Sequence, residues 1–428
     1  MPTNPTQPYD VAVIGLGYIG LPTAAFFASA GLNVYGVDIS TSRVNSIARG
    51  EAPFAEPGFA SLLDTVIDSG QLKVGDTLRN AGAFIIAVPT PLNADNGANT
   101  SFVYTATESI APLLQGGELI ILESTCPPGL TEEIAEFIVE RRPDLTLAPN
   151  KTNSIYVAHA PERVLPGKIM AEMKSNDRII GGVTPEAAAR VRELYKIFCT
   201  GEVRITDSRT AEMTKLAENS FRDVNIAFAN ELSMICDELD IDVWELISLA
   251  NRHPRVSILQ PGPGVGGHCI AIDPWFIVSS VEPETARLIS TGRQVNNSKP
   301  YYAINQVKHL AESSGVPENQ LKICLLGITF KADIDDLRES PALLVAEKIA
   351  ESFPDAQLCV VEPNLDELPP SLKKKGAQKV SLEDGIDGAT VTAVLVDHTE
   401  FKTSRSKIQT VPRLVDLRGL TSGDQKLG

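Results

Sequence analysis

The segment from Asp10 to Asp38 constrains the fold of this chain more than any other. A short apolar run ends at Gly15, and the glycines Gly15, Gly17 and Gly20 have the spacing G-x-G-x-x-G. A helical pattern rich in Ala and Phe follows, and a second apolar run ends at Asp38. This order of strand, tight turn, helix, strand and acid predicts a dinucleotide-binding βαβ unit, because the unpaired N–H groups and the dipole at a helix N-terminus favour a pyrophosphate.

The acid at the end of this unit predicts which dinucleotide binds. Asp38 follows Gly20 at the distance where a carboxylate accepts hydrogen bonds from the ribose hydroxyls. The same charge would repel a 2′-phosphate, so NAD is favoured over NADP. The alternative is a glycine-rich turn in a doubly wound sheet that binds no nucleotide.

Two further apolar runs, Ala83–Val88 and Glu118–Glu123, predict neighbouring strands of the same parallel sheet. Ligands of open parallel sheets bind beyond the carboxyl ends of the strands, so the loops that carry Thr90 and Thr125 are expected to face the nicotinamide. The Thr125 hydroxyl would hold a water or a substrate hydroxyl there. The alternative is that this hydroxyl caps the next helix.

A later strand pattern, residues 155–159, leads into Glu162 and Arg163. At the end of a strand, this pair suits an acid or base and a ligand for an anion. The alternative is an ordinary surface ion pair. Glu162 is therefore a candidate acid–base residue and Arg163 a candidate anion ligand.

A stretch without Gly or Pro, from Asp207 or the residue after it to about Leu239, predicts one long helix with a good N-cap. Lys215, Asn219 and Arg222 are three or four residues apart and therefore share one face of that helix. Polar residues on a helix are commonly only solvated, which is the alternative for these three. Their common face makes them candidates for the chemistry of a site.

The last third of the chain repeats the first pattern in an altered form. A strand pattern ends at Gly327, and a helix is expected to begin at Ser340 as N-cap and Pro341 as first residue. A long loop replaces the short glycine turn between them. This loop brings Lys331 and Arg338 to the place where phosphates would bind, which predicts a second nucleotide site of a different kind.

The glycine-rich stretch Pro261–Pro274 presents a cysteine in the manner of a nucleophile. Its glycines permit positive φ and close approach to a bound molecule, and Cys269 lies between His268 and the carboxylate of Asp273. A thiolate attacks carbonyl carbon readily, so the stretch predicts covalent chemistry on an aldehyde or acyl group. The alternative is a small buried cysteine in a tight loop. Cys126 is a second candidate nucleophile, ranked lower because two prolines follow it directly.

The composition excludes several classes of partner. The chain has 428 residues and a formal net charge of −16, which argues against binding to nucleic acid or to an anionic membrane surface. No apolar run is long enough for a membrane span and no secretory signal is recognisable, so a cytoplasmic protein is expected. The six cysteines are scattered without zinc spacing, so reduced thiols and no metal site are expected.

Six motifs in this order resemble the UDP-glucose/GDP-mannose dehydrogenase family over nearly the whole chain. They are GLGYIGLPTA, ESTCPPG, APERVLPGK, KLAENSFRD, GPGVGGHCIAIDP and GITFKADIDDLRESPA. The expected fold is α/β, with two Rossmann-like doubly wound domains joined by a long central helix. The expected domains are an NAD-binding domain at 1–206, a central helical dimerisation domain with the cysteine loop at 207–303, and a UDP-sugar-binding domain at 304–428. Cys126 and Leu130 depart from the usual pattern, which puts in doubt the packing near Thr125.

The resemblance implies an oxidation of a sugar C6 alcohol to an acid in two NAD-dependent steps. It assigns the chemistry to Cys269, Lys215, Asn219, Glu162, Asp273 and Thr125. The cysteine thiol would trap the intermediate aldehyde as a thiohemiacetal, and water would hydrolyse the resulting thioester. Lys215 and Asp273 would assist proton removal, Asn219 would donate to the oxygen, and Glu162 with Thr125 would manage the water.

The resemblance also implies which residues contact the ligands. The expected cofactor contacts are Gly15, Gly17, Tyr18, Ile19, Gly20, Asp38, Arg43, Thr90, Thr125 and Arg338. The expected substrate contacts are Arg163, Val164, Lys215, Asn219, Arg222, His253, Arg255, Gly266, Phe330, Lys331 and Arg418. The basic members of this set would supply the local positive charge that an anionic UDP-sugar requires.

The segment 251–256 with the glycine loop is most similar to the branch of the family that oxidises UDP-N-acetyl-D-mannosamine, for supply of a uronic acid to a surface polysaccharide. UDP-glucose and UDP-N-acetylglucosamine remain alternative substrates. A protein of another class, an NAD-responsive binding protein without catalysis, is also left open. In relatives an arginine of this segment reaches a neighbour's site, so a homo-oligomer, at least a dimer, is expected.

Overall fold

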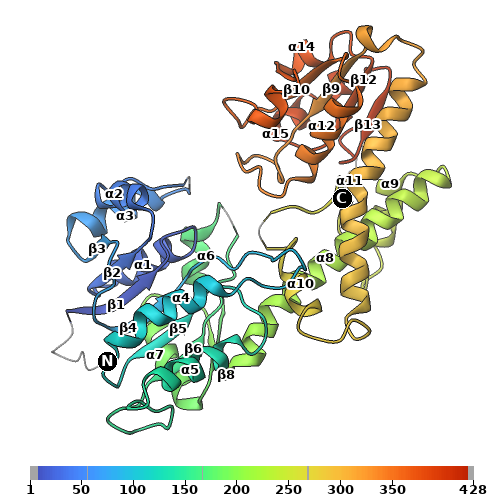
Figure 1. Ribbon diagram of the computed structural model, residues 1–428. Coiled ribbons are helices and arrows are strands. Elements are labelled where there is room, and N and C mark those ends of the chain that lie inside the picture. The colour runs from blue at the N-terminus through green and yellow to red at the C-terminus, as the bar shows by residue number, and fades with distance from the viewer. Residues whose placement is uncertain (1–7, 55, 166, 268, 423–428) are drawn as a thin grey trace. The chain divides into compact units, whose positions relative to one another are not determined.

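A computed structural model describes residues 8–54, 56–165, 167–267 and 269–422, and the chain falls into two compact units. Unit 1 comprises Met1–Ala217 with Trp275–Glu282, and unit 2 comprises Glu218–Pro274 with Pro283–Gly428. Each unit contains one parallel-type sheet with helices packed on both faces (Figure 1). The fold class expected from the sequence is therefore confirmed. The three-domain boundaries at 206 and 303 remain a prediction.

Unit 1 is built on an eight-stranded sheet with the order β3-β2-β1-β4-β5-β6-β7-β8. Neighbouring strands are parallel, except for the antiparallel pair β6 and β7. The first six strands have the doubly wound order of dinucleotide-binding proteins. The strands are β1 (Tyr9–Ile14), β2 (Val34–Val37), β3 (Leu72–Gly75), β4 (Ala81–Ile86), β5 (Leu119–Leu122), β6 (Tyr156–His159), β7 (Arg178–Gly182) and β8 (Val203–Asp207).

Alternation along β1 explains why this sheet is covered on both faces. Val11 and Val13 enter one apolar core, and Ala12 and Ile14 enter the other, because successive side chains of a strand point to opposite faces. The first core includes residues of α1, α3, α6 and α7, and the second includes residues of α4 and α5. The helices are α1 (Gly20–Ser29), α2 (Thr41–Ala48), α3 (Phe59–Asp68), α4 (Ser101–Ile110), α5 (Leu130–Arg141), α6 (Ile169–Ser175) and α7 (Pro185–Tyr195).

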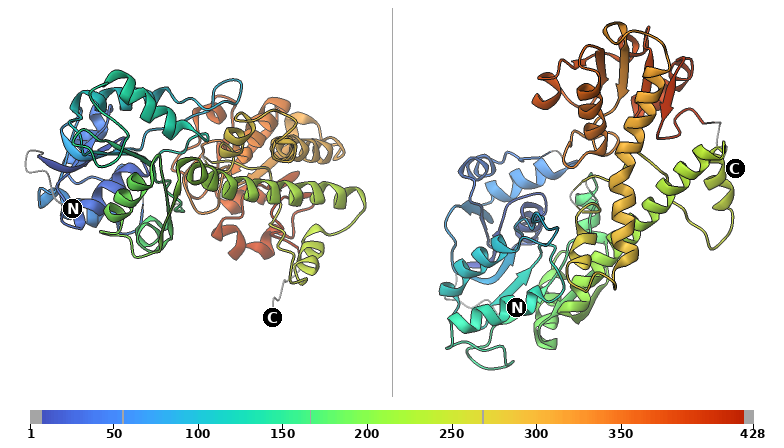
Figure 2. Two further views of the ribbon diagram at one scale, coloured as in Figure 1. Left: turned by 90° about the horizontal axis from the view of Figure 1, so that it is seen from below. Right: turned by 45° about the vertical axis from the view of Figure 1, so that its right-hand side comes forward.

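Two long helices occupy the middle of the sequence (Figure 2). Helix α8 begins with the cap predicted from the sequence, because Asp207 Oδ1 accepts a hydrogen bond from Thr210 N at 2.8 Å. Its end at Glu238 agrees with the predicted end near Leu239. The helices of this part are α8 (Ser208–Glu238), α9 (Val243–Ala250), α10 (Asp273–Val278) and α11 (Arg287–Glu312).

Unit 2 carries a five-stranded parallel sheet of order β11-β10-β9-β12-β13. Its strands are β9 (Lys322–Leu326), β10 (Gln357–Val361), β11 (Gln378–Lys379), β12 (Val391–Val394) and β13 (Leu414–Asp416). Its helices are α12 (Pro341–Ser352), α13 (Pro370–Lys373), α14 (Leu382–Ile386), α15 (Thr399–Thr403) and α16 (Arg405–Ile408). Around β9 this order repeats the arrangement around β1.

The predicted start of α12 is confirmed in detail. Ser340 Oγ accepts a hydrogen bond from Leu343 N at 3.2 Å, and Pro341 is the first helical residue. On β9, Ile323 and Leu325 enter one core while the residues between and after them enter the other, so this sheet is also buried on both faces. Among the described residues, no helix is both long enough and apolar enough to cross a bilayer.

Candidate active site

The glycine turn after β1 has the steric features of a phosphate-binding turn. Gly15 has φ +94°, and an added Cβ would lie 2.5 Å from Ala87 O. An added Cβ on Gly20 would lie 2.0 Å from Gly15 O, so both positions require glycine. An added Cβ on Gly17 would meet nothing within 4 Å. The turn therefore leaves open space beside the start of α1, where Ile19 supplies no side-chain cap.

Asp38 holds this turn in place. Its Oδ2 accepts hydrogen bonds from Leu16 N at 2.9 Å and from Arg43 NH1 at 3.0 Å, and its Oδ1 accepts from Ser40 N at 2.8 Å. Arg43 therefore lies beside Asp38. Both residues were expected to contact the cofactor. Tyr18 donates its hydroxyl hydrogen bond to Glu56 Oε2 at 3.1 Å, so its ring leaves the turn toward that segment.

The loops after β4 and β5 are joined to each other. Thr90 Oγ1 donates to Thr125 O at 2.7 Å, and Ser124 Oγ donates to Val88 O at 2.7 Å. Thr125 is half-buried and follows β5 at the carboxyl edge of the sheet. The two threonines predicted to face the nicotinamide are thus brought together by the fold.

Glu212 ties the first turns of α8 to the start of α5. Its carboxylate accepts from Gly129 N at 2.6 Å, from Thr131 N at 2.8 Å and from Thr131 Oγ1 at 2.5 Å. Burial raises the pKa of Glu212, although these hydrogen bonds oppose the shift. Cys126 Sγ lies 3.6 Å from the same carboxylate and is 1% exposed. The buried position of Cys126 agrees with its lower rank as a nucleophile.

Lys215 lies one turn further along α8, close enough to His159 to act on it electrostatically. Burial, and after it the positive charge of Lys215, lower the pKa of His159 to about 3. His159 is therefore a neutral imidazole at the end of β6. Lys215 itself is half-buried in unit 1.

Glu162 is buried rather than paired at the surface. Its Oε2 accepts from Arg178 NH2 at 2.5 Å and its Oε1 accepts from Arg163 N at 2.7 Å. The alternative of a surface pair with its sequence neighbour is therefore wrong, because the guanidinium of Arg163 donates to Asp177 O at 2.5 Å. Val164 packs against the apolar core of unit 1.

In unit 2, the exposed Cys269 is linked by a backbone turn to Asp273. Asp273 N donates to Cys269 O at 2.8 Å, and Asn219 Nδ2 donates to Asp273 Oδ2 at 2.6 Å. Asp273 is 2% exposed. Three of the predicted catalytic residues are thus brought together around one turn. His268, which was expected to flank the thiol, lies outside the described residues.

The glycines before Cys269 allow this loop to lie against the loop after β9. An added Cβ on Gly266 would lie 2.3 Å from Glu339 O, and one on Gly267 would lie 2.9 Å from the ring of Phe330. Gly267 N also donates to Arg338 O at 3.3 Å. The predicted substrate contacts Gly266 and Phe330 are therefore neighbours, while the Arg338 side chain pairs with Asp336 at 2.5 Å.

Arg418 fastens the start of the same glycine loop. Its NH1 donates to Pro261 O at 3.1 Å and its Nε donates to Asp397 Oδ1 at 2.8 Å. An added Cβ on Gly262 would lie 2.7 Å from Arg418 NH1. Arg418 therefore lies beside the cysteine loop, as expected for a substrate contact.

Four predicted substrate contacts have exposed side chains: Arg222, His253, Arg255 and Lys331. The described contacts do not join them to Cys269. His253 and Arg255 follow α9, and Arg255 N donates to His253 Nδ1 at 3.3 Å. Their roles as substrate contacts remain predictions.

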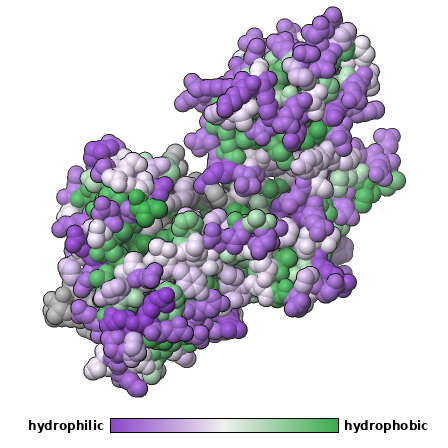
Figure 3. Space-filling model, viewed as in Figure 1, coloured by the Kyte–Doolittle hydropathy of each residue, from purple (hydrophilic) through white to green (hydrophobic). Residues whose placement is uncertain are grey.

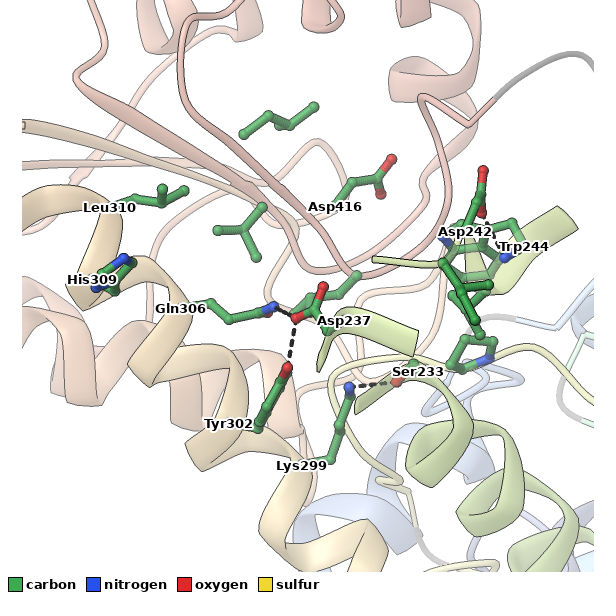
Figure 4. A pocket seen from close by; sticks show the side chains of 16 residues that line it. Ser233, Asp237, Asp242, Trp244, Lys299, Tyr302, Gln306, His309, Leu310 and Asp416 are labelled. Atoms are coloured by element: carbon green, nitrogen blue, oxygen red, sulfur yellow. Dashed lines mark hydrogen bonds between the residues drawn. The ribbon is translucent and has the colours of Figure 1, made fainter. Parts of the chain in front are cut away.

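Unit 2 also contains a cavity of about 460 Å³ (Figure 4). It is lined by residues of α8, α9, α11 and β13, and only Pro261 belongs to the glycine loop. Within it, Asp237 accepts from Tyr302 and Gln306, and Lys299 donates to Ser233 Oγ at 2.6 Å. Burial lowers the pKa of Lys299 to about 8. None of the predicted site residues lines this cavity.

Three residues that support the site are not indicated by any local sequence pattern. Arg178 and Glu123 surround Glu162, and Glu212 anchors the helix that carries Lys215. Each contact joins positions far apart in the chain, so no local spacing reveals it. Among the described residues, no group of three or more His, Cys, Asp or Glu could hold a metal ion.

The open space at Gly17, the uncapped start of α1 and the acid after β2 fit a dinucleotide pyrophosphate and ribose, so fold and site define an NAD-binding α/β oxidoreductase. The NAD binding, central and UDP binding domains of the UDP-glucose/GDP-mannose dehydrogenase family match residues 9–199, 209–298 and 324–423. The chain belongs to this family.

Relatives match over nearly the whole chain. A UDP-N-acetyl-D-mannosamine dehydrogenase of Escherichia coli (strain K12) is 51% identical over 96% of this chain and 98% of its own. An NDP-N-acetyl-D-galactosaminuronic acid dehydrogenase of Ralstonia nicotianae is 47% identical over 96% of each chain. The solved structure of a UDP-D-ManNAc dehydrogenase from Pyrococcus horikoshii has a TM-score of 0.86 and 37% identity, over 97% of this chain and 96% of that one.

Proposed function

We propose that this enzyme oxidises UDP-N-acetyl-D-mannosamine at C6 to the uronic acid. One alcohol, two NAD⁺ and one water would give one carboxylate, two NADH and three protons. The proposal rests mainly on one observation, the exposed Cys269 on a turn whose next carboxylate, Asp273, is held by Asn219. The sequence relatives named as UDP-N-acetyl-D-mannosamine dehydrogenases support the choice of sugar.

NAD would be held by the turn Gly15–Gly20 and by Asp38, and would accept one hydride in each oxidation step. The open space at Gly17 and the start of α1 would receive its pyrophosphate. Thr90 orients the loop that carries Thr125 through their hydrogen bond. These residues bind and orient the cofactor and take no part in bond making.

Cys269 would act as the nucleophile on the C6 aldehyde. Its sulfur would bond to the carbonyl carbon to give a thiohemiacetal, and oxidation would leave a thioester. Asn219 has two amide protons and gives one to Asp273, so the second can be donated to the C6 oxygen. Lys215 and Asp273 would accept and return the proton of that oxygen.

Hydrolysis would complete the reaction. Water attacks the thioester carbon, the carbon–sulfur bond breaks, and the sulfur leaves on Cys269. Glu162 would take the proton of this water, and Thr125 would hold the water in place. Arg163, Val164, Gly266, Phe330, Lys331 and Arg418 would contact the UDP-sugar, as expected from the sequence.

We further propose that the enzyme works as a homo-oligomer, at least a dimer. On α8 in unit 2, Phe221, Phe228 and Ile235 are seven residues apart and are 70%, 53% and 45% exposed, so they form one apolar stripe. Apolar residues are also exposed on α9, where the surface is partly green in Figure 3 and Leu249 is 60% exposed. Phe228→Glu should lower the assembled mass in sedimentation, and an unchanged mass would reject this surface. We place the enzyme in the cytoplasm, where the scattered cysteines would remain reduced.

Counting the NADH produced per sugar tests the activity. UDP-N-acetyl-D-mannosamine should give two NADH per molecule, whereas turnover with UDP-glucose or UDP-N-acetylglucosamine alone would reject the choice of sugar. Because the Ralstonia relative is named for a galactosaminuronic acid, UDP-N-acetyl-D-galactosamine belongs in the same assay. Binding of NAD without turnover of any sugar would favour a non-catalytic NAD-responsive protein.

Two cysteine variants test the mechanism. Cys269→Ser should form no covalent adduct and should not complete the four-electron oxidation. Cys126→Ser is the matched control and should keep two NADH per sugar, because Cys126 is buried against Glu212. Product formation by Cys269→Ser at the wild-type rate would remove Cys269 from the mechanism.

A further inference from the structure

Three charged side chains are buried together in unit 1, and only Glu162 among them belongs to the proposed chemistry. Arg178, the first residue of β7, is 3% exposed, Glu162 is 6% exposed and Glu123, directly after β5, is 2% exposed. Arg178 NH2 donates to Glu162 Oε2 at 2.5 Å. Arg178 NH1 lies 3.9 Å from Glu123 Oε1. One guanidinium therefore faces two carboxylates.

Aromatic rings and hydroxyl groups surround Arg178 and Glu123 in this triad. The Arg178 guanidinium carbon lies 4.6 Å from the centre of the Tyr195 ring and 5.7 Å from that of Phe198. Thr23 Oγ1 donates to Glu123 Oε2 at 3.0 Å, and Tyr195 OH donates to Glu123 Oε1 at 3.1 Å. The described groups that face Glu123 thus come from α1, α7, β7 and the segment after β6.

The triad has one positive charge for two acids. Two buried carboxylates beside one guanidinium do not both ionise easily. Burial, and after it the charge of Glu162, raise the pKa of Glu123 to about 7, while Arg178 opposes the shift. Among the described residues, Arg178 NH1 has no hydrogen-bond partner and would bond an ionised Glu123.

We propose that Arg178 is a positioning residue that orients Glu162 for thioester hydrolysis, and that Glu123 adjusts this role by competing for the same guanidinium. This inference rests on the proposed function. When Glu123 is protonated, the Arg178 guanidinium forms an ion pair with Glu162 alone. Arg178 NH2 and Arg163 N then fix one lone pair on each Glu162 oxygen, and another remains to take the proton of the attacking water.

A single-turnover experiment separates this role from a purely structural one. Arg178→Met should still release two NADH per active site in the first turnover, because both oxidations precede hydrolysis. Its steady-state turnover should fall by roughly 100-fold or more, and intact mass should show the sugar acyl group on Cys269. Arg178→Lys should have a steady-state turnover at least roughly tenfold higher than that of Arg178→Met, because lysine restores the positive charge. The matched control is Arg204→Met on the adjacent strand β8, which removes an exposed pair with Glu202 and should behave as wild type.

The second variant tests Glu123 without removing the guanidinium. In the wild type, the rate of adduct hydrolysis should fall as the pH rises, with a midpoint near pH 7. Glu123→Gln should keep the low-pH rate across this range, because its neutral amide replaces the protonated acid. An unchanged pH profile would overturn the role of Glu123.

The outcomes distinguish the two proposals. Equal loss of the first-turnover NADH and of steady turnover in Arg178→Met, with no adduct, would overturn the role of Arg178. Wild-type turnover by this variant would overturn it as well. Absence of NADH from any UDP-sugar with the wild-type enzyme would instead reject the proposed function.

Discussion

The two sheets of this chain use one turn in two ways. In unit 1, Gly15 follows β1 with φ +94°, and in unit 2, Gly327 follows β9 with φ +83°. The acid after the second strand accepts from the residue next to the glycine in both units. Asp38 accepts from Leu16 N at 2.9 Å, and Glu362 accepts from Ile328 N at 2.8 Å. The frame is therefore the same to the level of single hydrogen bonds.

The two turns differ in the segment between the glycine and the next helix. In unit 1 the next helix begins at Gly20, and the turn leaves open space at Gly17. In unit 2 the next helix begins at Pro341, and the intervening loop is hydrogen-bonded to Glu362 and His398, which follow β10 and β12. His398 supports that loop, because its Nδ1 accepts from Asp333 N at 2.9 Å while its Nε2 lies 3.2 Å from Glu362 Oε2.

This difference shows how one βαβ frame provides two kinds of binding surface. A short turn exposes the N-terminus of its helix to a phosphate-containing ligand. A long loop fills that place with protein, and its side chains Phe330 and Lys331 are the ones predicted to contact the substrate. Asp38 is predicted to lie beside the cofactor, whereas Glu362 is buried and supports the loop.

The largest expected effect comes from the shared glycine. Gly15→Ala and Gly327→Ala would place a Cβ 2.5 Å from Ala87 O and 2.5 Å from Val396 Cβ, at positive φ in both cases. Each should lower the free energy of unfolding of its own unit by about 2–4 kcal/mol, measured by denaturant titration. Gly15→Ala should also abolish NAD binding, and Gly327→Ala should abolish UDP binding. Loss of UDP binding in Gly15→Ala, or of NAD binding in Gly327→Ala, would contradict the assignment of the two turns.

Gly17→Ala is the control for this comparison. Its Cβ would meet no protein atom within 4 Å, so stability should stay unchanged. NAD affinity should fall by roughly 10–100-fold, because the methyl group would occupy the space of the pyrophosphate. Wild-type NAD affinity in calorimetry would show that the cofactor does not approach this turn.

The two units should also respond to pH in opposite directions. The pKa of Glu123 is raised to about 7, mainly by burial, so unit 1 loses stability as pH rises from about 4.5 to 7, by about 3 kcal/mol. Burial opposes ionisation of Glu362, but hydrogen bonds from His398 and Ile328 N outweigh it and lower its pKa. Unit 2 therefore keeps this contribution above the ordinary glutamate pKa and loses it as pH falls.

Unfolding free energies measured from pH 3 to 9 check this expectation. Glu123→Gln should remove the decline between about pH 5 and 7, and Glu362→Gln should remove part of the decline in acid. A wild-type protein whose stability rises between pH 5 and 7 would contradict the sign given for Glu123, unless another group outweighs Glu123. The difference in unfolding free energy between the wild type and Glu123→Gln isolates the contribution of Glu123.

A smaller effect is expected from exchanging each acid for its amide. Asp38→Asn should weaken NAD binding by roughly tenfold and leave UDP binding unchanged, and Glu362→Gln should do the reverse. The reason is that one carboxylate faces the cofactor turn and the other holds the loop of Phe330. Calorimetry with each ligand measures both, and equal losses for both ligands in one variant would show a general loss of folding.

The smallest effect is expected from Arg43. Its side chain is 42% exposed, so its pair with Asp38 should contribute at most about 1 kcal/mol. Arg43→Met should weaken NAD binding only a few-fold. Arg49→Met, which removes an exposed pair with Glu51, is the control and should have no effect. A loss as large as that of Gly17→Ala would mean that Arg43 contacts a phosphate directly.

The sequence predicted those features that local chemistry determines. The glycine turn, the cap at Asp207 and the start of α12 at Ser340 and Pro341 each depend on residues within a few positions, and all agree with the structure. The sequence also singles out Cys269, because glycines and an acid surround it in the chain, and this cysteine is exposed in the structure. Its catalytic role remains a prediction.

Contacts between distant segments could not be predicted. The pair of Glu162 and Arg178 depends on the antiparallel pairing of β7 with β6. Nothing in the sequence near either residue indicates this pairing. The support of Glu362 by His398 likewise needs β10 and β12 to lie on the two sides of β9 first. Such pairs follow from topology, so an isolated E-R pair read as a surface pair was the wrong interpretation.

Cys269 is exposed while the five other cysteines are buried. A limiting amount of an alkylating reagent should therefore label one thiol in the folded enzyme and leave the others untouched. The extent of labelling would give the concentration of competent active centres without any substrate. The same selectivity makes this position the entry point for electrophilic inhibitors and for damage by oxidants.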